Sequence, residues 1–214
     1  MLCVTIAERN FESCLSVIKN DKLYEIRLDK IILSNEEIEK LFKLPVMTIA
    51  TCKTGGFFSN EECLNRLKIA IGTGAKYVDV EYESSENYRL ELIELAKKNN
   101  CSIIISYHNF QQTPSTSELN EIATNCFKLG ADIVKISTMI NSNADNAKIL
   151  SLYERTEKII SFGMGDKGKI TRIIAPLLGA EFTYAAVSSS KTIAPGQLGK
   201  EEMLAVLNTL NDVC

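Results

Sequence analysis

Eight short apolar runs alternate with eight longer amphipathic stretches along the 214 residues of the chain. This alternation predicts an α/β protein, and specifically a (β/α)8 TIM barrel. The repeat length supports the same fold, because roughly 22 to 31 residues separate successive strand ends, the length of one strand–helix unit. No low-complexity segment or Pro/Gly-rich linker divides the chain. We therefore expect residues 1–214 to form a single barrel domain.

The predicted strands are short and rich in Ile, Val and other apolar residues, as expected for a parallel sheet that is buried on both faces. In chain order they are Leu2–Ile6, Leu23–Leu28, Val46–Ala50, Tyr77–Tyr82, Ser102–Tyr107, Ile133–Ser137, Lys158–Phe162 and Ala180–Ala185. A doubly wound open sheet has the same alternation and is the alternative fold. Against it, residues 7–10 after the first strand contain no Gly-rich phosphate-binding loop.

The predicted helices fill every gap between strands. They are Phe11–Lys19, Asn35–Phe42, Asn60–Gly72, Glu86–Asn99, Thr116–Leu129, Asn143–Tyr153, Ile170–Leu178 and Glu201–Val213. Three of them begin with the Ser-x-x-Glu spacing of a capping box, at Ser34, Ser59 and Ser115. The last helix carries a stripe that we expect to pack on the barrel, formed by Met203, Val206, Leu207, Leu210 and Val213.

Composition and charge exclude several classes of function. A net charge of −3 and a pI near 5.4 give no support for binding nucleic acid or an anionic membrane. The apolar N-terminal run meets charge at Glu8 and is too short for a signal peptide or a membrane span. The seven cysteines include no Cys-x-x-Cys pair, which fits reduced thiols and a cytoplasmic protein. With one histidine in the chain, we expect no metal site.

The chain's single histidine and one of its lysines suggest a catalytic centre. His108 ends the fifth predicted strand, and Lys135 lies inside the apolar sixth strand. Imidazole is the side chain best suited to move protons near neutral pH. Burial among Ile and Val would lower the pKa of Lys135 and favour its nucleophilic amine. Together the two residues predict carbonyl chemistry through a Schiff base.

Polar residues end the other predicted strands, which would converge on one mouth of a barrel. Glu25 and Arg27 are two positions apart and would therefore share a face of the second strand. The fourth strand ends in three alternating carboxylates, Asp79, Glu81 and Glu83, of which we expect only one to be catalytic.

Two further candidates follow the last two strands. Arg172 comes after the seventh strand, and Gln197 closes an Ala-Pro-Gly-Gln turn after the eighth. Each candidate also has a structural explanation. Glu25 and Arg27 could form an ion pair that closes the barrel end, Lys135 could extend to the rim, and Arg172 could be a surface charge. Their coincidence at successive strand ends favours an active site.

These motifs, in this order, resemble those of the type I 3-dehydroquinate dehydratase family, and the similarity runs from about residue 2 to the end of the chain. The resembling segments are Glu25-x-Arg27, the strand ending at Glu81, Ser-Tyr-His108-Asn-Phe, Val-Lys135-Ile, Thr-Arg172 and Ala-Pro-Gly-Gln197. The resemblance implies a TIM-barrel lyase of the shikimate pathway of aromatic amino acid biosynthesis. It also implies a homodimer that needs no metal or organic cofactor. In some organisms this module is fused to shikimate dehydrogenase, and the present sequence is compatible with such an origin.

The resemblance also implies a role for each residue. Lys135 would form an imine with the C3 ketone of 3-dehydroquinate, and His108 would act as general acid and base on the way to 3-dehydroshikimate. Glu81 would hydrogen-bond His108 and fix its tautomer. Arg172 would bind the substrate carboxylate and Gln197 would hydrogen-bond the substrate near it, while Glu25 and Arg27 would contact the ring hydroxyls.

The chain departs from the family pattern at three positions. Ala50 stands where the family usually has Arg, Thr54 where it has Glu, and Ile193 where it has Ser or Thr. The missing arginine would normally reach substrate hydroxyls, and Lys53 could substitute for it from three residues further on. The loss of a hydroxyl at Ile193 removes one contact of the loop that covers the site.

Two other functions remain open on the sequence. Another class I Schiff-base barrel, such as an aldolase, would also have a buried lysine, and Gly163, Gly165 and Gly168 offer a weak phosphate-binding turn for its substrate. A catalytically impaired barrel that only binds ligands would be consistent with Ala50 and Ile193.

Overall fold

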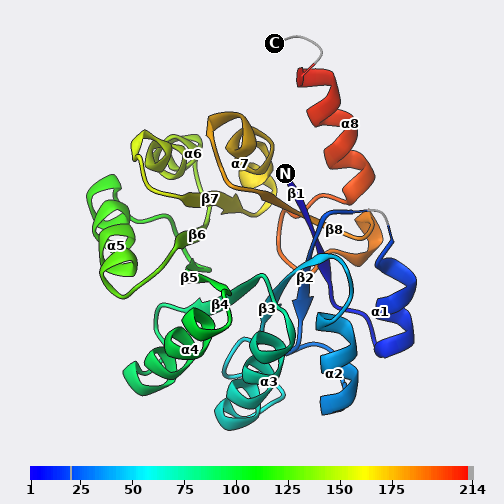
Figure 1. The fold of residues 1–214 in the computed structure, drawn as a ribbon. Coiled ribbons are helices and arrows are strands. Elements are labelled where there is room, and N and C mark those ends of the chain that lie inside the picture. The colour runs from blue at the N-terminus through cyan, green and yellow to red at the C-terminus, as the bar shows by residue number, and fades with distance from the viewer. Residues whose placement is uncertain (20, 212–214) are drawn as a thin grey trace.

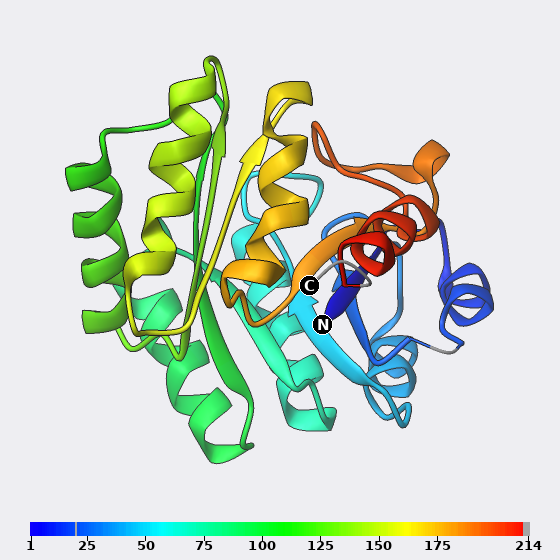
Figure 2. The same cartoon turned by 90° about the horizontal axis from the view of Figure 1, so that it is seen from above.

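The computed structural model describes residues 1–19 and 21–211. Within these residues eight parallel strands curve into a barrel, and eight α-helices surround it (Figures 1 and 2). The predicted (β/α)8 fold is therefore confirmed. All strands run in the same direction, because each helix returns the chain to the end of the barrel where the next strand begins.

The strands are β1 (Leu2–Ile6), β2 (Leu23–Arg27), β3 (Met47–Thr51), β4 (Tyr77–Glu81), β5 (Ser102–Asn109), β6 (Ile133–Met139), β7 (Ile159–Met164) and β8 (Thr183–Ala186). The helices are α1 (Phe11–Val17), α2 (Asn35–Phe42), α3 (Asn60–Thr73), α4 (Glu86–Lys98), α5 (Thr116–Lys128), α6 (Asn143–Leu150), α7 (Lys169–Ile174) and α8 (Lys200–Asn211). Every predicted element is present, and most bounds differ by one to three residues.

The largest differences in length have local causes. The predicted helix 170–178 continues after α7 only as a 3-10 turn over Ala175–Leu178. Pro176 lies in that turn, and its missing N–H cannot continue an α-helical ladder. The three predicted capping boxes at Ser34, Ser59 and Ser115 are all present, each with reciprocal side-chain and backbone hydrogen bonds.

Neighbouring strands pair in sequence order, with β8 returning to β1. In the described part of the chain no hydrogen-bonded ladder joins β7 to β8, which are the two ends of the sheet order. Side chains and loops meet across this seam instead. The ring centroids of Phe162 and Tyr184 are 5.8 Å apart, and the N–H of Gly165 donates to the carbonyl of Pro195 at 3.1 Å.

The strand alternation divides the core into two layers. One set of side chains fills the barrel interior, namely Cys3, Leu23, Ile49, Tyr77, Ile104, Ile133, Ile160, Phe162, Phe182 and Tyr184. The intervening residues pack between strands and helices in a larger cluster. The interior layer fills the barrel as far as the carboxyl ends of the strands, so polar side chains two residues further along, such as Glu25 after Leu23, are held above it.

The stripe expected on the last helix is only partly buried. Met203 is buried, Leu207 and Leu210 are half-buried, and Val206 is 37% exposed. Val213 lies outside the described residues. The far end of α8 extends away from the barrel in Figure 1, which explains why the stripe is not covered along its whole length. Among the described residues no helix is long and apolar enough to cross a membrane.

Candidate active site

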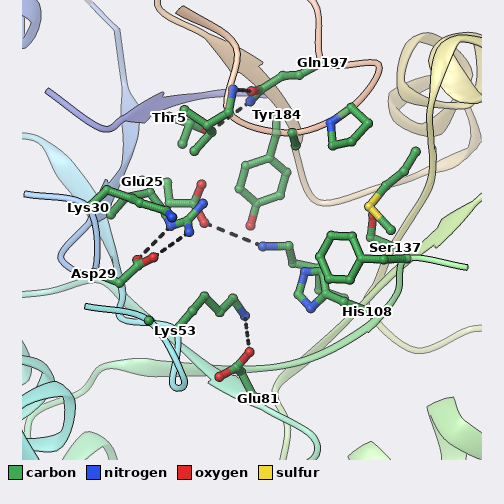
Figure 3. A pocket seen from close by; sticks show the side chains of 18 of the residues that line it. Thr5, Glu25, Asp29, Lys30, Lys53, Glu81, His108, Ser137, Tyr184 and Gln197 are labelled. Carbon is green, nitrogen blue, oxygen red and sulfur yellow. Dashed lines mark hydrogen bonds and ion pairs between the residues drawn. The ribbon is translucent and has the colours of Figure 1, made fainter. Parts of the chain in front are cut away.

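A cavity of about 390 Å³ opens at the carboxyl ends of the strands, where TIM-barrel sites form. It is lined by all seven residues that the sequence singled out: Glu25, Arg27, Glu81, His108, Lys135, Arg172 and Gln197. Figure 3 shows four of them, Glu25, Glu81, His108 and Gln197, around this pocket. No group of three or more His, Cys, Asp or Glu side chains in the described ranges could hold a metal ion.

Lys135 is buried and paired with a carboxylate. Its Nζ donates to Asp79 Oδ2 at 2.9 Å and lies 3.6 Å from Glu25 Oε1. Burial alone would lower the pKa of this amine, but the charges of Asp79 and Glu25 outweigh burial and raise the pKa above its ordinary value. The expectation of a neutral amine in the free site is therefore wrong, because the sequence could not show how close Asp79 lies.

His108 lies on β5, next to the strand that carries Lys135. The pairing of Ser106 with Lys135 and of His108 with Ser137 turns all four side chains to the same face. Burial, reinforced by the positive charges of Lys53 and Lys135, holds the pKa of His108 well below its ordinary value. The ring of Phe110 stacks against the imidazole with centroids 6.1 Å apart. The free site therefore contains a neutral imidazole beside an ammonium group.

A second amine, that of Lys53, shares Asp79 with Lys135. Its Nζ donates to Asp79 Oδ1 and to Ser106 Oγ, both at 2.8 Å. Lys135 and Lys53 therefore hold the two oxygens of one buried carboxylate, and their charges keep the pKa of Asp79 well below its ordinary range despite its burial. The Lys53 amine is therefore bound to Asp79 and Ser106, instead of standing free to contact substrate hydroxyls in place of the missing arginine.

Glu81 contacts the loop after β3 rather than the imidazole. Its Oε2 accepts hydrogen bonds from the backbone N–H and the hydroxyl of Thr54, at 2.9 and 2.8 Å. Its Oε1 lies 3.8 Å from Lys53 Nζ. No hydrogen bond joins Glu81 to His108 in the described structure. Thr54 is one of the family departures, and here its short side chain is the partner of Glu81.

Arg27 and Glu25 project into the same cavity but do not pair with each other. Arg27 forms a two-point ion pair with Asp29, Nε to Oδ1 at 2.9 Å and Nη2 to Oδ2 at 2.6 Å. Glu25 accepts from the Thr51 hydroxyl at 3.0 Å and faces Lys135. The alternative of a Glu25–Arg27 ion pair closing the barrel end is therefore wrong.

Arg172 is a buried cation without a counter-ion among the described residues. Its side chain is 1% exposed, and its Nε and Nη2 atoms have no hydrogen-bond partner in the described chain. The guanidinium carbon lies 4.2 Å from the centroid of the Phe162 ring. Burial lowers the pKa of Arg172 to about 10. Because an isolated buried charge is costly, this arrangement is typical of a site that receives an anion.

Gln197 ties together the turn that follows β8. Its Oε1 accepts from the backbone N–H of Ile193 at 3.0 Å, and its Nε2 donates to the Thr5 hydroxyl at 3.3 Å. Ile193 and Pro195 line the cavity from this turn. The isoleucine therefore contributes apolar surface where the family pattern has a hydroxyl.

Ala50 does not line the cavity. It is fully buried in the cluster between strands and helices, because it alternates with Ile49 and Thr51, which face the barrel interior. An arginine introduced here in this backbone would enter the outer core rather than the site. Replacing Ala50 with arginine would therefore not restore the contact with substrate hydroxyls that the family pattern implies for this position.

The glycine-rich segment after β7 is not a phosphate-binding turn with free backbone N–H groups. The N–H of Gly163 donates to the Thr171 hydroxyl at 2.7 Å, that of Gly165 to Pro195, and that of Gly168 to the carbonyl of Gly165 at 3.0 Å. Gly163 and Gly168 are also so close that a Cβ on either would clash with the other's backbone. All three donors are used internally, which argues against the aldolase alternative with a phosphorylated substrate.

Sequence reasoning missed several residues of the site. The sequence pattern does not distinguish Asp79 from Glu81 and Glu83, although its position two residues before Glu81 places it deeper in the barrel. The importance of Ser106 and Tyr184 had no signal in the sequence, since both occur in ordinary apolar strands. Only the pairing register brings Ser106 beside Asp79, with Oγ to Oδ1 at 2.6 Å.

The fold and the cavity define a class of protein: a (β/α)8 barrel enzyme with a buried lysine and a histidine on adjacent strands, the arrangement suited to Schiff-base chemistry on a carbonyl compound. The sequence model of the family described as type I 3-dehydroquinase matches residues 2–213. The chain belongs to this family. The family predicted from the motifs is thus confirmed.

Individual relatives agree with this assignment. The 3-dehydroquinate dehydratase of Methanocaldococcus jannaschii is 37% identical over 207 residues, which cover 92% of this chain and 93% of that protein. The crystal structure of the 3-dehydroquinate dehydratase from Aquifex aeolicus is 27% identical, with a TM-score of 0.78 and coverage of 98% of both chains. The type I enzyme from Clostridium difficile shares the fold, with a TM-score of 0.87 at 24% identity over the whole of this chain and 92% of that one.

Proposed function

We propose that this enzyme converts 3-dehydroquinate to 3-dehydroshikimate and water, with Lys135 as the Schiff-base lysine and His108 as general acid and base. The observation that carries the proposal is the unpaired guanidinium of Arg172 in the same cavity as the Lys135–His108 pair. The substrate has a carboxylate and a ketone in one small molecule, and the cavity offers a partner for each.

The first stage is imine formation. Lys135 rests as an ammonium group, so a proton must leave it before attack, and the neutral imidazole of His108 is the acceptor at hand. The amine nitrogen then bonds to C3, and the proton that this nitrogen loses goes to the ketone oxygen, which becomes a hydroxyl. His108 returns its proton to this hydroxyl, the C–O bond breaks, and water leaves a protonated imine. The Asp79 carboxylate remains beside the nitrogen and offsets its positive charge.

The second stage is elimination. The protonated imine draws electrons from the neighbouring carbon, so His108 can take the C2 proton and leave a neutral enamine. The enamine then expels the C1 hydroxyl, which departs as water with the proton from His108. Hydrolysis of the conjugated imine releases 3-dehydroshikimate and frees Lys135.

Substrate binding follows from the charges around the cavity. Arg172 takes the carboxylate with its two unpartnered nitrogen atoms, and Gln197 adds a contact near it. Glu25 and Arg27 face the ring hydroxyls from β2. Glu81 acts indirectly, because it holds Thr54 and the loop after β3 beside Lys53.

The test of this function combines an assay with trapping. Dehydration of 3-dehydroquinate is followed by the ultraviolet absorbance of the conjugated product. Borohydride added during turnover should reduce the imine and inactivate the enzyme, with the adduct on Lys135 by peptide mass mapping. Lys135→Ala should abolish both turnover and trapping. An adduct on Lys53 or Lys191 in the wild-type enzyme would contradict the assignment of Lys135.

A second variant separates the two catalytic residues. His108→Ala keeps the amine, so we expect slow imine formation without efficient proton transfer at C2 and C1. Imine species should then accumulate and be visible by mass spectrometry without reductant. Rapid turnover by this variant would remove His108 from the mechanism, because the chain has no second histidine.

We further propose that the enzyme is a homodimer. In support, four large apolar side chains are exposed on α7, α8 and the turn between α7 and β8: Ile170, Leu177, Leu178 and Val206. Burying such side chains against a second copy is favourable. Sedimentation equilibrium of the wild type and of Leu177→Asp tests this. A monomeric wild type, or a variant that dimerises equally well, would contradict it.

We also propose a cytoplasmic location. Six cysteines, Cys3, Cys14, Cys52, Cys63, Cys101 and Cys126, are free and buried in the described structure, which suits a reducing compartment. Fractionation of the source cells with an antibody to the protein would test this, and recovery from an oxidising compartment would contradict it.

A further inference from the structure

The polar groups of the cavity fall into two sets, those with partners inside the protein and those without. Lys135 and Lys53 each pair with Asp79, Arg27 pairs with Asp29, and Glu81 pairs with Thr54. Among the buried side-chain nitrogen and oxygen atoms that line the cavity, only those of Arg172 and Tyr184 lack a partner in the described chain. Arg172 is accounted for by the substrate carboxylate, but the Tyr184 hydroxyl has no assigned use.

The position of Tyr184 relates it to the reacting amine. It lies on β8, opposite Cys3 of β1, and its side chain is 2% exposed. The Nζ of Lys135 lies 4.4 Å from the centroid of its ring. In Figure 3 the hydroxyl end of Tyr184 points into the pocket, toward the space between Glu25 and His108. No hydrogen bond to Lys135 or Glu25 is formed in the described structure.

A buried hydroxyl without a partner is costly for the folded protein. Leaving such a group unsatisfied forfeits its hydrogen bonds to water, whereas phenylalanine would fill the same space without that cost. The surrounding rings, Phe162 and Phe182, do not require a phenol, since their contacts are with the ring of Tyr184. The hydroxyl therefore makes sense if its partner arrives with the substrate.

We propose that Tyr184 is a further catalytic residue, whose hydroxyl donates a hydrogen bond to the oxygen on the carbon that Lys135 attacks. This inference rests on the Schiff-base function proposed above. As the Lys135 nitrogen bonds to that carbon, the electron pair of the C=O bond moves to the oxygen. Tyr184 lines the same cavity as Lys135 and its hydroxyl has no partner in the described chain, so it can stabilise this oxygen while the negative charge develops.

The ring and the hydroxyl would act at different moments. The ring face lies against the nitrogen and favours a positive charge there, both in the resting ammonium and in the protonated imine. The hydroxyl acts only while the oxygen is attached to the reacting carbon, and its contact ends when water leaves. Burial raises the pKa of Tyr184 well above its ordinary value, so the phenol stays protonated and remains a donor throughout the working pH range. The proton that completes the departing water comes from His108, and Tyr184 only lends a hydrogen bond.

The experiment compares Tyr184→Phe with the wild-type enzyme in single turnovers. Enzyme is mixed with saturating 3-dehydroquinate, borohydride is added at set times, and the adduct on Lys135 is quantified by mass spectrometry. We expect the variant to form imine about 10- to 100-fold more slowly, because one hydrogen bond to the developing charge is lost. The apparent KM should change much less. The melting temperature should not fall, since the variant removes a hydroxyl that has no partner in the protein.

A matched control keeps the test specific. Tyr77 belongs to the same interior cluster but does not line the cavity. Tyr77→Phe therefore removes an equivalent phenol oxygen and should leave the rate of imine formation unchanged.

The outcomes separate this inference from the function on which it rests. If the wild-type enzyme traps no adduct on Lys135, the Schiff-base function fails and Tyr184 loses its role with it. If the wild type traps and Tyr184→Phe traps at the same rate, the inference alone is overturned. A variant with raised KM and an unchanged rate at saturation would make Tyr184 a binding residue, which also overturns it.

Discussion

Asp79 Oδ2 accepts a hydrogen bond from Lys135 Nζ at 2.9 Å, and both side chains are almost completely buried. This contact decides the resting state of the site, because it holds the lysine as an ammonium group. The nucleophile is therefore activated when its proton leaves, and not by burial alone. The same carboxylate is already in place to neutralise the protonated imine.

The first prediction concerns Asp79→Asn. The variant leaves two amines, those of Lys135 and Lys53, without their shared charge. Breaking a buried pair in this way typically costs about 3–5 kcal/mol of stability. With the main opposing charge removed, the pKa of Lys135 should fall. The pH dependence of borohydride trapping should therefore move to lower pH while kcat falls.

Urea denaturation measures the first effect, and trapping across a pH series measures the second. Glu83→Gln is the control, since this exposed carboxylate lies just beyond the same strand. If the trapping profile of Asp79→Asn coincided with that of the wild type, Asp79 would not control the protonation of Lys135.

The second prediction concerns Arg172→Gln. Its unpartnered atoms are assigned to a carboxylate, and a hydrogen bond involving a charged group contributes about 1.5–3 kcal/mol. Loss of two such bonds should raise KM about 100-fold or more. Misplacement of the substrate should also lower kcat. The variant should fold, because a buried cation without a counter-ion is not a source of stability.

Steady-state kinetics with 3-dehydroquinate measures both constants. Lys169→Gln is the control on the same helix, where the replaced charge is exposed and pairs with Asp166. An unchanged KM for Arg172→Gln would show that the carboxylate is bound elsewhere.

Sequence could predict the barrel because strand and helix patterns are local, and it could predict convergence of His108 and Lys135 because barrel strands end at one mouth. It could not predict which carboxylate lies beside which amine. Asp79 and Lys135 are 56 residues apart, and their contact depends on the register of β4 with β5 and of β5 with β6. For the same reason the expected bond from Glu81 to His108 is replaced by bonds to Thr54, whose loop conformation has no sequence signature.

The third prediction concerns Ala50. The sequence does not show whether this side chain faces the cavity or the helices. Because Ala50 packs between the sheet and the helices, Ala50→Arg would bury a cation in the outer core. We expect the variant to lose several kcal/mol of stability and to gain no affinity for substrate. Thermal denaturation and KM test this together. The control Ala50→Ser changes the volume little and should remain folded. A stable Ala50→Arg enzyme with a lower KM would mean that this position does reach the hydroxyl-binding part of the site.

The last prediction uses the fact that His108 is the only histidine. Its pKa is lowered in the folded protein by burial and by the charges of Lys53 and Lys135. Below the ordinary value of 6.5 the unfolded chain therefore binds a proton that the folded protein refuses. Stability must then fall as the pH decreases from about 6.5 toward the folded pKa, by at most about 1.4 kcal/mol per pH unit for this one group. His108→Gln, which has no proton to bind, should lack this component.

The difference between the two proteins isolates His108, since the carboxylates that titrate in acid are common to both. Denaturation at a series of pH values gives the two curves, and the single imidazole signal in an NMR titration gives the pKa directly. The acid limb of the dehydratase pH profile should follow that signal, because His108 must be neutral to accept a proton from Lys135. If the imidazole titrated near 6.5 in the free enzyme, Lys53 and Lys135 would not control the pKa of His108. The mechanism could then not rely on the charges of these lysines to keep His108 neutral as a proton acceptor.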